Sequence, residues 1–95
     1  MKIYISGPIS SDPYHEEKFK RAEKILRGMG HEPINPAAVG KAWQCVTYKE
    51  YLDNDLRLLE ECDGIFMLRG WQRSKGARLE HNYAKTTGLW IRYQG

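Results

Sequence analysis

The chain has 95 residues and a mass of 11.1 kDa, which is the size of one domain, and we place that domain at residues 1–95. Hydrophobic residues make up 41% and charged residues 28%, a balance that excludes a disordered chain and a membrane-spanning one. The net charge of +3 permits an anionic ligand but is too small to indicate nucleic acid as a partner.

The two cysteines, Cys45 and Cys62, are too few for a disulfide framework or a Cys-rich zinc site. The first residues, Met1 to Pro8, reach a turn signal after three apolar side chains and so do not form a signal peptide. We therefore expect a cytoplasmic protein that does not bind membranes.

The first part of the chain predicts a strand, a helix and a second strand. Residues 2–6 are β-branched and aromatic and end at a Gly-Pro pair, which is typical of a strand. Residues 14–29 carry apolar side chains at spacings of three and four, which predicts a helix with Asp12 as its N-cap. Residues 31–35 contain a proline, which favours a short strand at a sheet edge.

The second part of the chain predicts two more helices and two more strands. A loop at 36–46 leads to a capping box of Thr47 and Glu50, which opens an amphipathic helix. A continuous apolar run then predicts a strand buried on both faces. A further loop occupies residues 69–73. The predicted helices cover 47–62 and 74–87, and the predicted strands cover 64–68 and 89–93.

Strands that alternate with helices indicate a parallel sheet. Right-handed crossovers then favour a small doubly wound α/β fold, Rossmann-like or flavodoxin-like, with strand order 2-1-3-4 and helices on both faces. Ligands bind such sheets at the carboxyl ends of the strands, where the strand order reverses. The segments delivered to that place are residues 6–10, Asn35 with Pro36, and residues 69–76.

Two carboxylates lie on or near the inward side of their predicted helices. Glu80 shares a helical stripe with Ala77 and Ala84, so small side chains flank it. The alternative is a carboxylate on a solvated face. Asp55 lies among leucines and tyrosines. The alternative interpretation is that it occupies the boundary of the apolar face, where its side chain reaches water or Arg57.

A pair of carboxyl groups in one pocket can divide nucleophilic and acid roles, as in cleavage at an anomeric carbon. Tyr4, in the middle of the first predicted strand, is placed to orient a carboxylate, or else it fills the core. Because two carboxyl groups suffice for this chemistry, no cofactor is required.

The loop and helix start after the third strand are rich in cations, which attract a phosphate or simply form a solvated face. The first-turn amides of a helix also bind anions. The cations are Arg69, Arg73, Lys75 and Arg78, and the helix start contains Ser74 and Gly76.

Trp43 and Trp71 are available to stack on a base or to cover the core. The three histidines lack metal-ligand spacing, so no metal site is predicted.

Four patches of the sequence carry a family resemblance. The chain resembles the nucleoside 2-deoxyribosyltransferase superfamily, especially its short bacterial and phage members, and is similar to the 2′-deoxynucleoside 5′-phosphate N-hydrolases. The patches are Tyr4-Ile5-Ser6-Gly7-Pro8-Ile9; Gly30-His31 with Asn35-Pro36; Asp55 with Leu59 and Cys62-Asp63; and Ser74, Gly76, Glu80 and Ala84.

The resemblance implies a role for several residues. Glu80 falls on the family's nucleophile, which attacks C1′ of the deoxyribose. Asp55 falls on the aspartate that assists departure of the base, and Tyr4 on the tyrosine that holds the glutamate. The hydrolase branch has an arginine where this chain has Ser10. The expected substrate-binding residues are Gly7, Pro8, Ile9, Asn35, Trp71, Ser74 and Gly76.

The resulting hypothesis is an enzyme that cleaves or transfers the N-glycosidic bond of a 2′-deoxynucleoside or its 5′-monophosphate, through a deoxyribosyl-glutamate intermediate. The alternative is a non-catalytic nucleotide-binding module, such as a sensor or partner subunit. A nucleic-acid adaptor ranks last because of the small charge. The short chain and the resemblance also predict a homodimer or higher homo-oligomer, with Tyr48 and Tyr51 at the interface.

Overall fold

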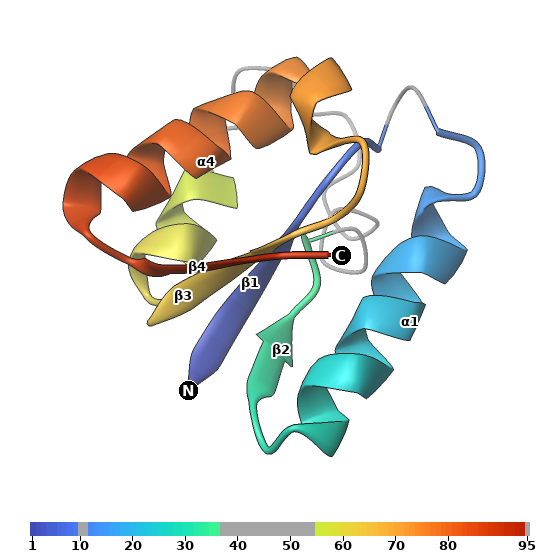
Figure 1. Ribbon diagram of the computed structural model, residues 1–95, viewed down its shortest axis with the longest axis horizontal. Coiled ribbons are helices and arrows are strands. Elements are labelled where there is room, and N and C mark those ends of the chain that lie inside the picture. The colour runs from blue at the N-terminus through green and yellow to red at the C-terminus, as the bar shows by residue number, and fades with distance from the viewer. Residues whose placement is uncertain (10–11, 37–54, 95) are drawn as a thin grey trace.

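A parallel sheet of four strands organises the protein, with helices packed around it (Figure 1). The structure is a computed structural model that describes residues 1–9, 12–36 and 55–94. In chain order its elements are β1 (Lys2–Ser6), α1 (His15–Gly28), β2 (Glu32–Ile34), helical residues 55–60, β3 (Gly64–Met67), the 3₁₀ helix η1 (Trp71–Arg73), α4 (Lys75–Thr87) and β4 (Trp90–Tyr93).

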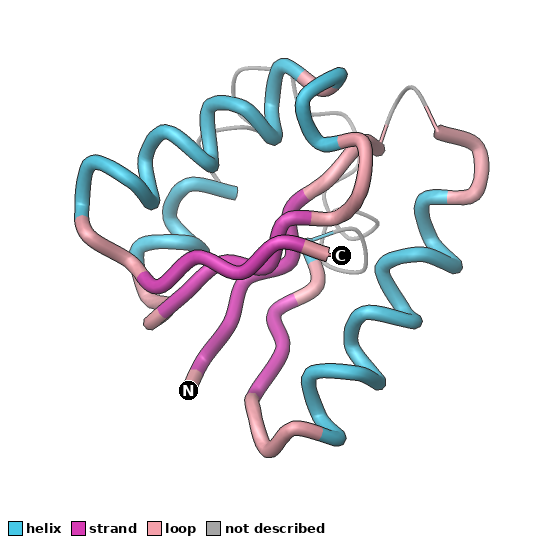
Figure 2. Tube along the Cα trace, in the orientation of Figure 1, coloured by secondary structure: helices cyan, strands magenta, loops and turns pink. Residues whose placement is uncertain are grey.

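The strand order is β2-β1-β3-β4, and every neighbouring pair is parallel. The sheet lies between α1 on one side and α4 with helical residues 55–60 on the other (Figure 2). The predicted α/β class, strand order and two helical layers are therefore confirmed. Strand β2, which contains Pro33, is an edge strand as predicted.

The alternation of side chains along the strands divides the core into two clusters, because successive residues of a strand point to opposite faces. On β1, Ile3 and Ile5 face α1, whereas Tyr4 faces α4. The cluster under α1 contains Ile3, Ile5, Phe19, Ala22, Leu26, Phe66 and Leu68. The cluster under α4 contains Tyr4, Leu59, Cys62, Ile65, Met67, Ala77 and Ala84.

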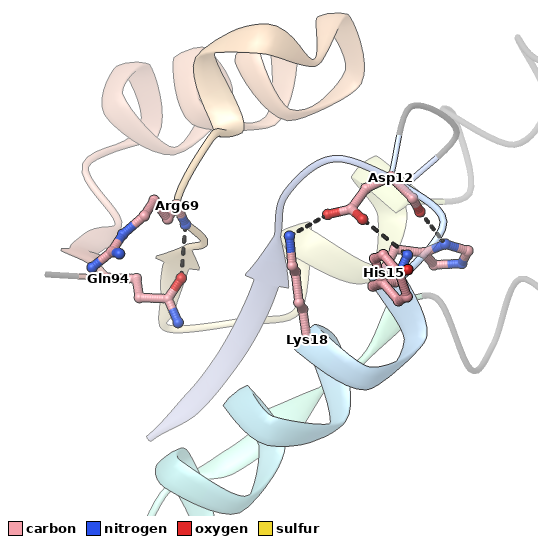
Figure 3. Close-up of polar contacts among 6 residues, drawn as sticks. Asp12, His15, Lys18, Arg69 and Gln94 are labelled. Atoms are coloured by element: carbon pink, nitrogen blue, oxygen red, sulfur yellow. Dashed lines mark hydrogen bonds and ion pairs between the residues drawn. The ribbon is translucent and has the colours of Figure 1, made fainter.

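The beginning of α1 differs from the prediction, because Tyr14 and not Asp12 is the N-cap residue. The Asp12 carboxylate lies two residues before the cap and has other hydrogen-bond partners. It accepts hydrogen bonds from the backbone N–H of Tyr14 at 2.9 Å and from Nζ of Lys18 at 2.6 Å (Figure 3). The backbone carbonyl of Asp12 also accepts from the N–H of His15 at 3.2 Å. Asp12 thus forms a turn before the helix and does not cap it.

The start and end of α4 follow the prediction. The hydroxyl oxygen of Ser74 accepts a hydrogen bond from the backbone N–H of Ala77 at 3.2 Å, which caps the helix. Gly88 ends the helix with a φ of +75°, a conformation that suits glycine. The segment 69–73, predicted as a loop, contains η1.

Some predictions lie outside the described residues: Ser10, Trp43, Cys45, the Thr47–Glu50 capping box, Tyr48 and Tyr51. Of the predicted helix 47–62, the structure describes residues 55–60 as helical. Across residues 1–9, 12–36 and 55–94, no helix combines the length and the apolar character needed to cross a bilayer.

Candidate functional site

Glu80 lies on the face of α4 that packs against the sheet. Ala77, Glu80 and Ala84 are the buried residues of this helix, and Glu80 is only 5% exposed. The spacing of three and four residues places all three on one stripe, in agreement with the sequence pattern. The small alanine side chains bring the helix close to the sheet and leave the Glu80 carboxylate facing β1.

Two hydroxyl groups of β1 hold the Glu80 carboxylate. The Tyr4 hydroxyl donates to Oε2 at 2.5 Å, and the Ser6 hydroxyl donates to Oε1 at 2.6 Å. Tyr4 and Ser6 are two residues apart on the strand, so their side chains point to the same face. Both are buried, with exposures of 0% and 1%. Each carboxylate oxygen therefore has its own donor, and the orientation of the group is fixed.

Asp55 completes a buried constellation with Glu80 and Tyr4. It begins the described helical residues 55–60 and is 7% exposed. Burial, with a smaller effect from the negative charge of Glu80, raises the pKa of Asp55 to about 8, and a hydrogen bond with Tyr4 acts in the opposite direction. The two carboxyl groups thus interact electrostatically and share contact with one tyrosine.

Burial also raises the pKa of Glu80, to about 7, although the hydrogen bonds from Ser6 and Tyr4 favour its ionised form. Because two hydroxyl donors favour the ionised form of Glu80, Asp55 carries the proton when the two groups hold one between them. The arrangement then presents an ionised carboxylate at Glu80 and an acid at Asp55. These are the two states that a nucleophile and a proton donor require.

The predicted binding residues Gly7, Pro8, Ile9 and Asn35 follow the ends of β1 and β2, and they differ in burial and packing. Gly7 is buried, and a Cβ at this position would lie 2.8 Å from Cβ of Leu68, so packing explains this glycine. Pro8 is half-buried, and Ile9 packs against the cluster under α1. Asn35 is buried just after β2.

Ser74, Gly76 and Trp71 lie on the segment between β3 and α4. The Ser74 hydroxyl oxygen is used to cap α4, and Gly76, in the first turn, is half-buried. Trp71 is stacked on His81, with ring centroids 4.2 Å apart and planes at 30°. His81 in turn is 2.7 Å from the Tyr93 hydroxyl through its Nε2. Trp71 therefore belongs to an aromatic cluster of Trp71, His81 and Tyr93.

The four cations of this segment, Arg69, Arg73, Lys75 and Arg78, are all exposed. Their exposure matches the solvated face that the sequence pattern allows. The backbone N–H of Arg69 donates to Oε1 of Gln94 at 2.8 Å, which ties this segment to the residue after β4 (Figure 3). Within the described part of the chain, no group of three or more His, Cys, Asp or Glu side chains is arranged to hold a metal ion.

Sequence reasoning missed Ser6 as a partner of Glu80. The signal was present, because Ser6 follows Tyr4 by two residues on the same strand, and side chains with this spacing share a face. A polar residue on the inward face of a buried strand also needs a hydrogen-bond partner. Glu80 supplies that partner.

Comparisons with known proteins agree with the fold. A family model described as "Domain of unknown function (DUF4406)" matches residues 1–93. The solved structure of a 2-deoxyribosyltransferase from the psychrotolerant bacterium Bacillus psychrosaccharolyticus superposes with a TM-score of 0.75 at 20% sequence identity. The match covers 98% of this chain and 71% of that one. At this identity the likeness establishes a common fold. The search of curated proteins found no match.

Proposed function

The chain belongs to the DUF4406 family, and we propose that it is an enzyme acting on the N-glycosidic bond of a 2′-deoxynucleoside or its 5′-monophosphate. One observation carries the proposal: two buried carboxyl groups, Glu80 and Asp55, meet at the hydroxyl of Tyr4. The shared fold with a 2-deoxyribosyltransferase supports the choice of reaction, since the family resemblance of the sequence implies the same chemistry.

In the first proposed step, an ionised oxygen of Glu80 attacks C1′ of the deoxyribose. The bond between C1′ and the base nitrogen breaks, and its electron pair leaves with the base. Asp55 donates its proton to the departing base and becomes a carboxylate. The products are the free base and a deoxyribosyl ester on Glu80. Tyr4 positions the nucleophile and contacts the acid.

The second proposed step resolves the ester. Water attacks C1′, Glu80 leaves as a carboxylate, and the ionised Asp55 takes the proton that the water loses. When a second base replaces water, its nitrogen attacks C1′ and the reaction is a transfer. Either route returns Glu80 to its ionised form and Asp55 to its acid form. The chain's own carboxyl groups therefore provide both roles, and the proposed reaction requires no cofactor.

The proposed substrate contacts follow the carboxyl ends of the strands, where ligands of doubly wound sheets bind. Glu80 and Asp55 contact the sugar and the leaving base in this scheme. The other proposed contacts are Gly7, Pro8, Ile9, Asn35, Trp71, Ser74 and Gly76. For Ser74 the structure adds a condition, because its oxygen already caps α4, so it would contact a substrate by donating its hydroxyl hydrogen.

The test is an incubation of the protein with the common 2′-deoxynucleosides and their 5′-monophosphates, with and without an added second base. Chromatography then measures free base and exchanged nucleoside. We expect release by the wild type and by Glu60→Gln, whose side chain is exposed on the same helix as Asp55, and loss of release in Glu80→Gln. Release that is equal in Glu80→Gln overturns the proposed mechanism. Saturable binding without release overturns catalysis and favours the nucleotide-binding module.

A further inference from the structure

The Glu80 carboxylate has a second donor that the proposed mechanism does not use. The Ser6 hydroxyl lies 2.6 Å from Oε1 and is itself 1% exposed. The backbone of Ser6 is held by β3, since Ser6 is in register with Met67 and its carbonyl accepts from the N–H of Leu68 at 2.8 Å. Gly7, the next residue, packs directly on Leu68. Ser6 is thus a fixed donor on a rigid strand.

From this geometry we infer that Ser6 is a second positioning residue for Glu80. The Ser6 hydroxyl holds Oε1, and the Tyr4 hydroxyl holds Oε2, so that the carboxylate stays ionised and oriented for attack. This inference rests on the proposed function of the same site. It adds a residue that acts through Glu80 and does not itself touch the substrate.

Ser6 and Tyr4 are not equivalent donors. A tyrosine hydroxyl has one hydrogen to donate, and Tyr4 contacts both Glu80 and Asp55. When Asp55 gives up its proton and becomes a carboxylate, it competes with Glu80 for the Tyr4 hydroxyl. Ser6 has Glu80 as its carboxylate partner, so its hydrogen bond persists on the ester and on the carboxylate that leaves in the second step. Ser6 therefore makes Glu80 a better leaving group as well as an ionised nucleophile.

The surroundings of Glu80 leave few other groups to perform this role. From β1, Tyr4 and Ser6 face the carboxylate, and helical residues 55–60 contribute Asp55. Strand β3 presents only apolar side chains, Ile65 and Met67, to the face that α4 covers. Along the buried stripe of α4, the neighbours of Glu80 are Ala77 and Ala84. Among the described residues, removal of the Ser6 hydroxyl would leave Tyr4 as the remaining hydroxyl donor to Glu80.

The first test is the pH profile of base release in Ser6→Ala and Ser6→Thr. Loss of the hydroxyl raises the pKa of Glu80, so we expect the acidic limb of kcat/KM to shift to higher pH by about one unit. At a given pH on that limb, this shift lowers kcat/KM about ten-fold. The loss of kcat/KM arises from a lower kcat more than from a changed KM, because Ser6 does not bind the substrate. Ser6→Thr keeps a hydroxyl and returns the limb toward the wild-type position. An unchanged limb in Ser6→Ala overturns the inference.

A second readout does not depend on activity. NMR of protein labelled at the glutamate side-chain carboxyl carbons follows the titration of Glu80, assigned by its absence in Glu80→Gln. We expect Ser6→Ala to shift this titration to higher pH, and Thr87→Ala, which removes an exposed hydroxyl at the end of α4, to leave it unchanged. If Ser6→Ala does not fold, Ser6→Cys, which weakens the hydrogen bond at similar volume, replaces it.

The two readouts separate this inference from the proposed function. A titration that shifts in a protein without any base release supports the Ser6 contact and contradicts the proposed function. Base release that depends on Glu80, together with an unshifted titration and an unshifted limb, supports the proposed function and overturns the role of Ser6.

Discussion

The hydroxyl of Tyr4 lies 2.5 Å from Oε2 of Glu80, although the two residues are 76 positions apart in the chain. The contact joins the first strand to the last helix of the structure and lies in the cluster under α4, away from water. In such surroundings a hydrogen bond to a carboxylate is stronger than in water, and loss of the donor leaves the charge poorly compensated. Tyr4 is therefore central to the electrostatics of both acids.

Replacement of Tyr4 by phenylalanine removes this donor and retains the ring. We expect a loss of at least ten-fold in kcat and a shift of the acidic limb of the pH profile to higher pH, because the pKa of Glu80 rises when a donor to its ionised form is lost. Steady-state kinetics of base release measures both effects. The matched control is Tyr14→Phe, since Tyr14 is exposed at the start of α1. Equal losses in the two variants would contradict the role given to Tyr4.

The pH dependence of the wild-type reaction should be a narrow bell. Activity requires Glu80 ionised and Asp55 protonated, and burial raises their pKa values to about 7 and about 8. The rate therefore rises as pH increases through about 7 and falls above about 8. In Asp55→Asn the falling limb should disappear along with most of the rate. A wild-type rate that stays level to pH 10 would exclude Asp55 as the acid.

The same pKa values predict how stability changes with pH. In the unfolded chain, Asp55 and Glu80 ionise near 3.8 and 4.5, whereas in the folded protein they hold their protons to about 8 and about 7. The stability that these two groups contribute is fully present below their unfolded pKa values and is lost as pH rises through the folded ones, because between these limits the folded state binds more protons than the unfolded state.

Each of the two groups contributes a decline of up to about 1.4 kcal/mol per pH unit to the free energy of unfolding. Urea denaturation between pH 5 and 8 measures the slope. Glu80→Gln should flatten it, and Glu60→Gln should not, since Glu60 is exposed. A free energy of unfolding that increases over this range in the wild type would show that the two acids are not the controlling groups.

Gly7 provides a test of the packing that supports the site. A methyl group at this position would lie 2.8 Å from Cβ of Leu68, so Gly7→Ala forces β1 and the residue after β3 apart. We expect a loss of roughly 1–3 kcal/mol in the free energy of unfolding. Gly28→Ala is the control, because a Cβ there meets no neighbouring atom within 4 Å and alanine favours the helix. Thermal or urea denaturation of the two variants should give effects of opposite sign.

The features that the sequence predicted well depend on local periodicity. Ile3 and Ile5 alternate with Tyr4, which already assigns them to opposite faces of a strand, and the spacing of Ala77, Glu80 and Ala84 assigns Glu80 to the inward side of a helix. Alternation of strands and helices then fixes the topology through the handedness of the crossovers.

The features that the sequence did not predict depend on distances between elements or on competing local partners. The bond from Ser6 to Glu80 requires the actual separation of β1 and α4. Asp12 has both Tyr14 and Lys18 as partners, and their combined geometry places it in a turn before the helix. The stacking of Trp71 on His81 joins residues that no periodicity relates, because η1 and α4 meet only in the folded chain.

The most direct test of the central proposal is a search for the ester on Glu80. The protein is mixed with a 2′-deoxynucleoside or its 5′-monophosphate, quenched rapidly in acid and digested, and mass spectrometry is applied to the peptide that contains Glu80. We expect this peptide to gain the mass of one deoxyribosyl group, with its 5′-phosphate when the monophosphate is used, and the gain to be absent in Glu80→Gln. Release of free base by Glu80→Gln at the wild-type rate, with no modified peptide in either protein, would contradict the account.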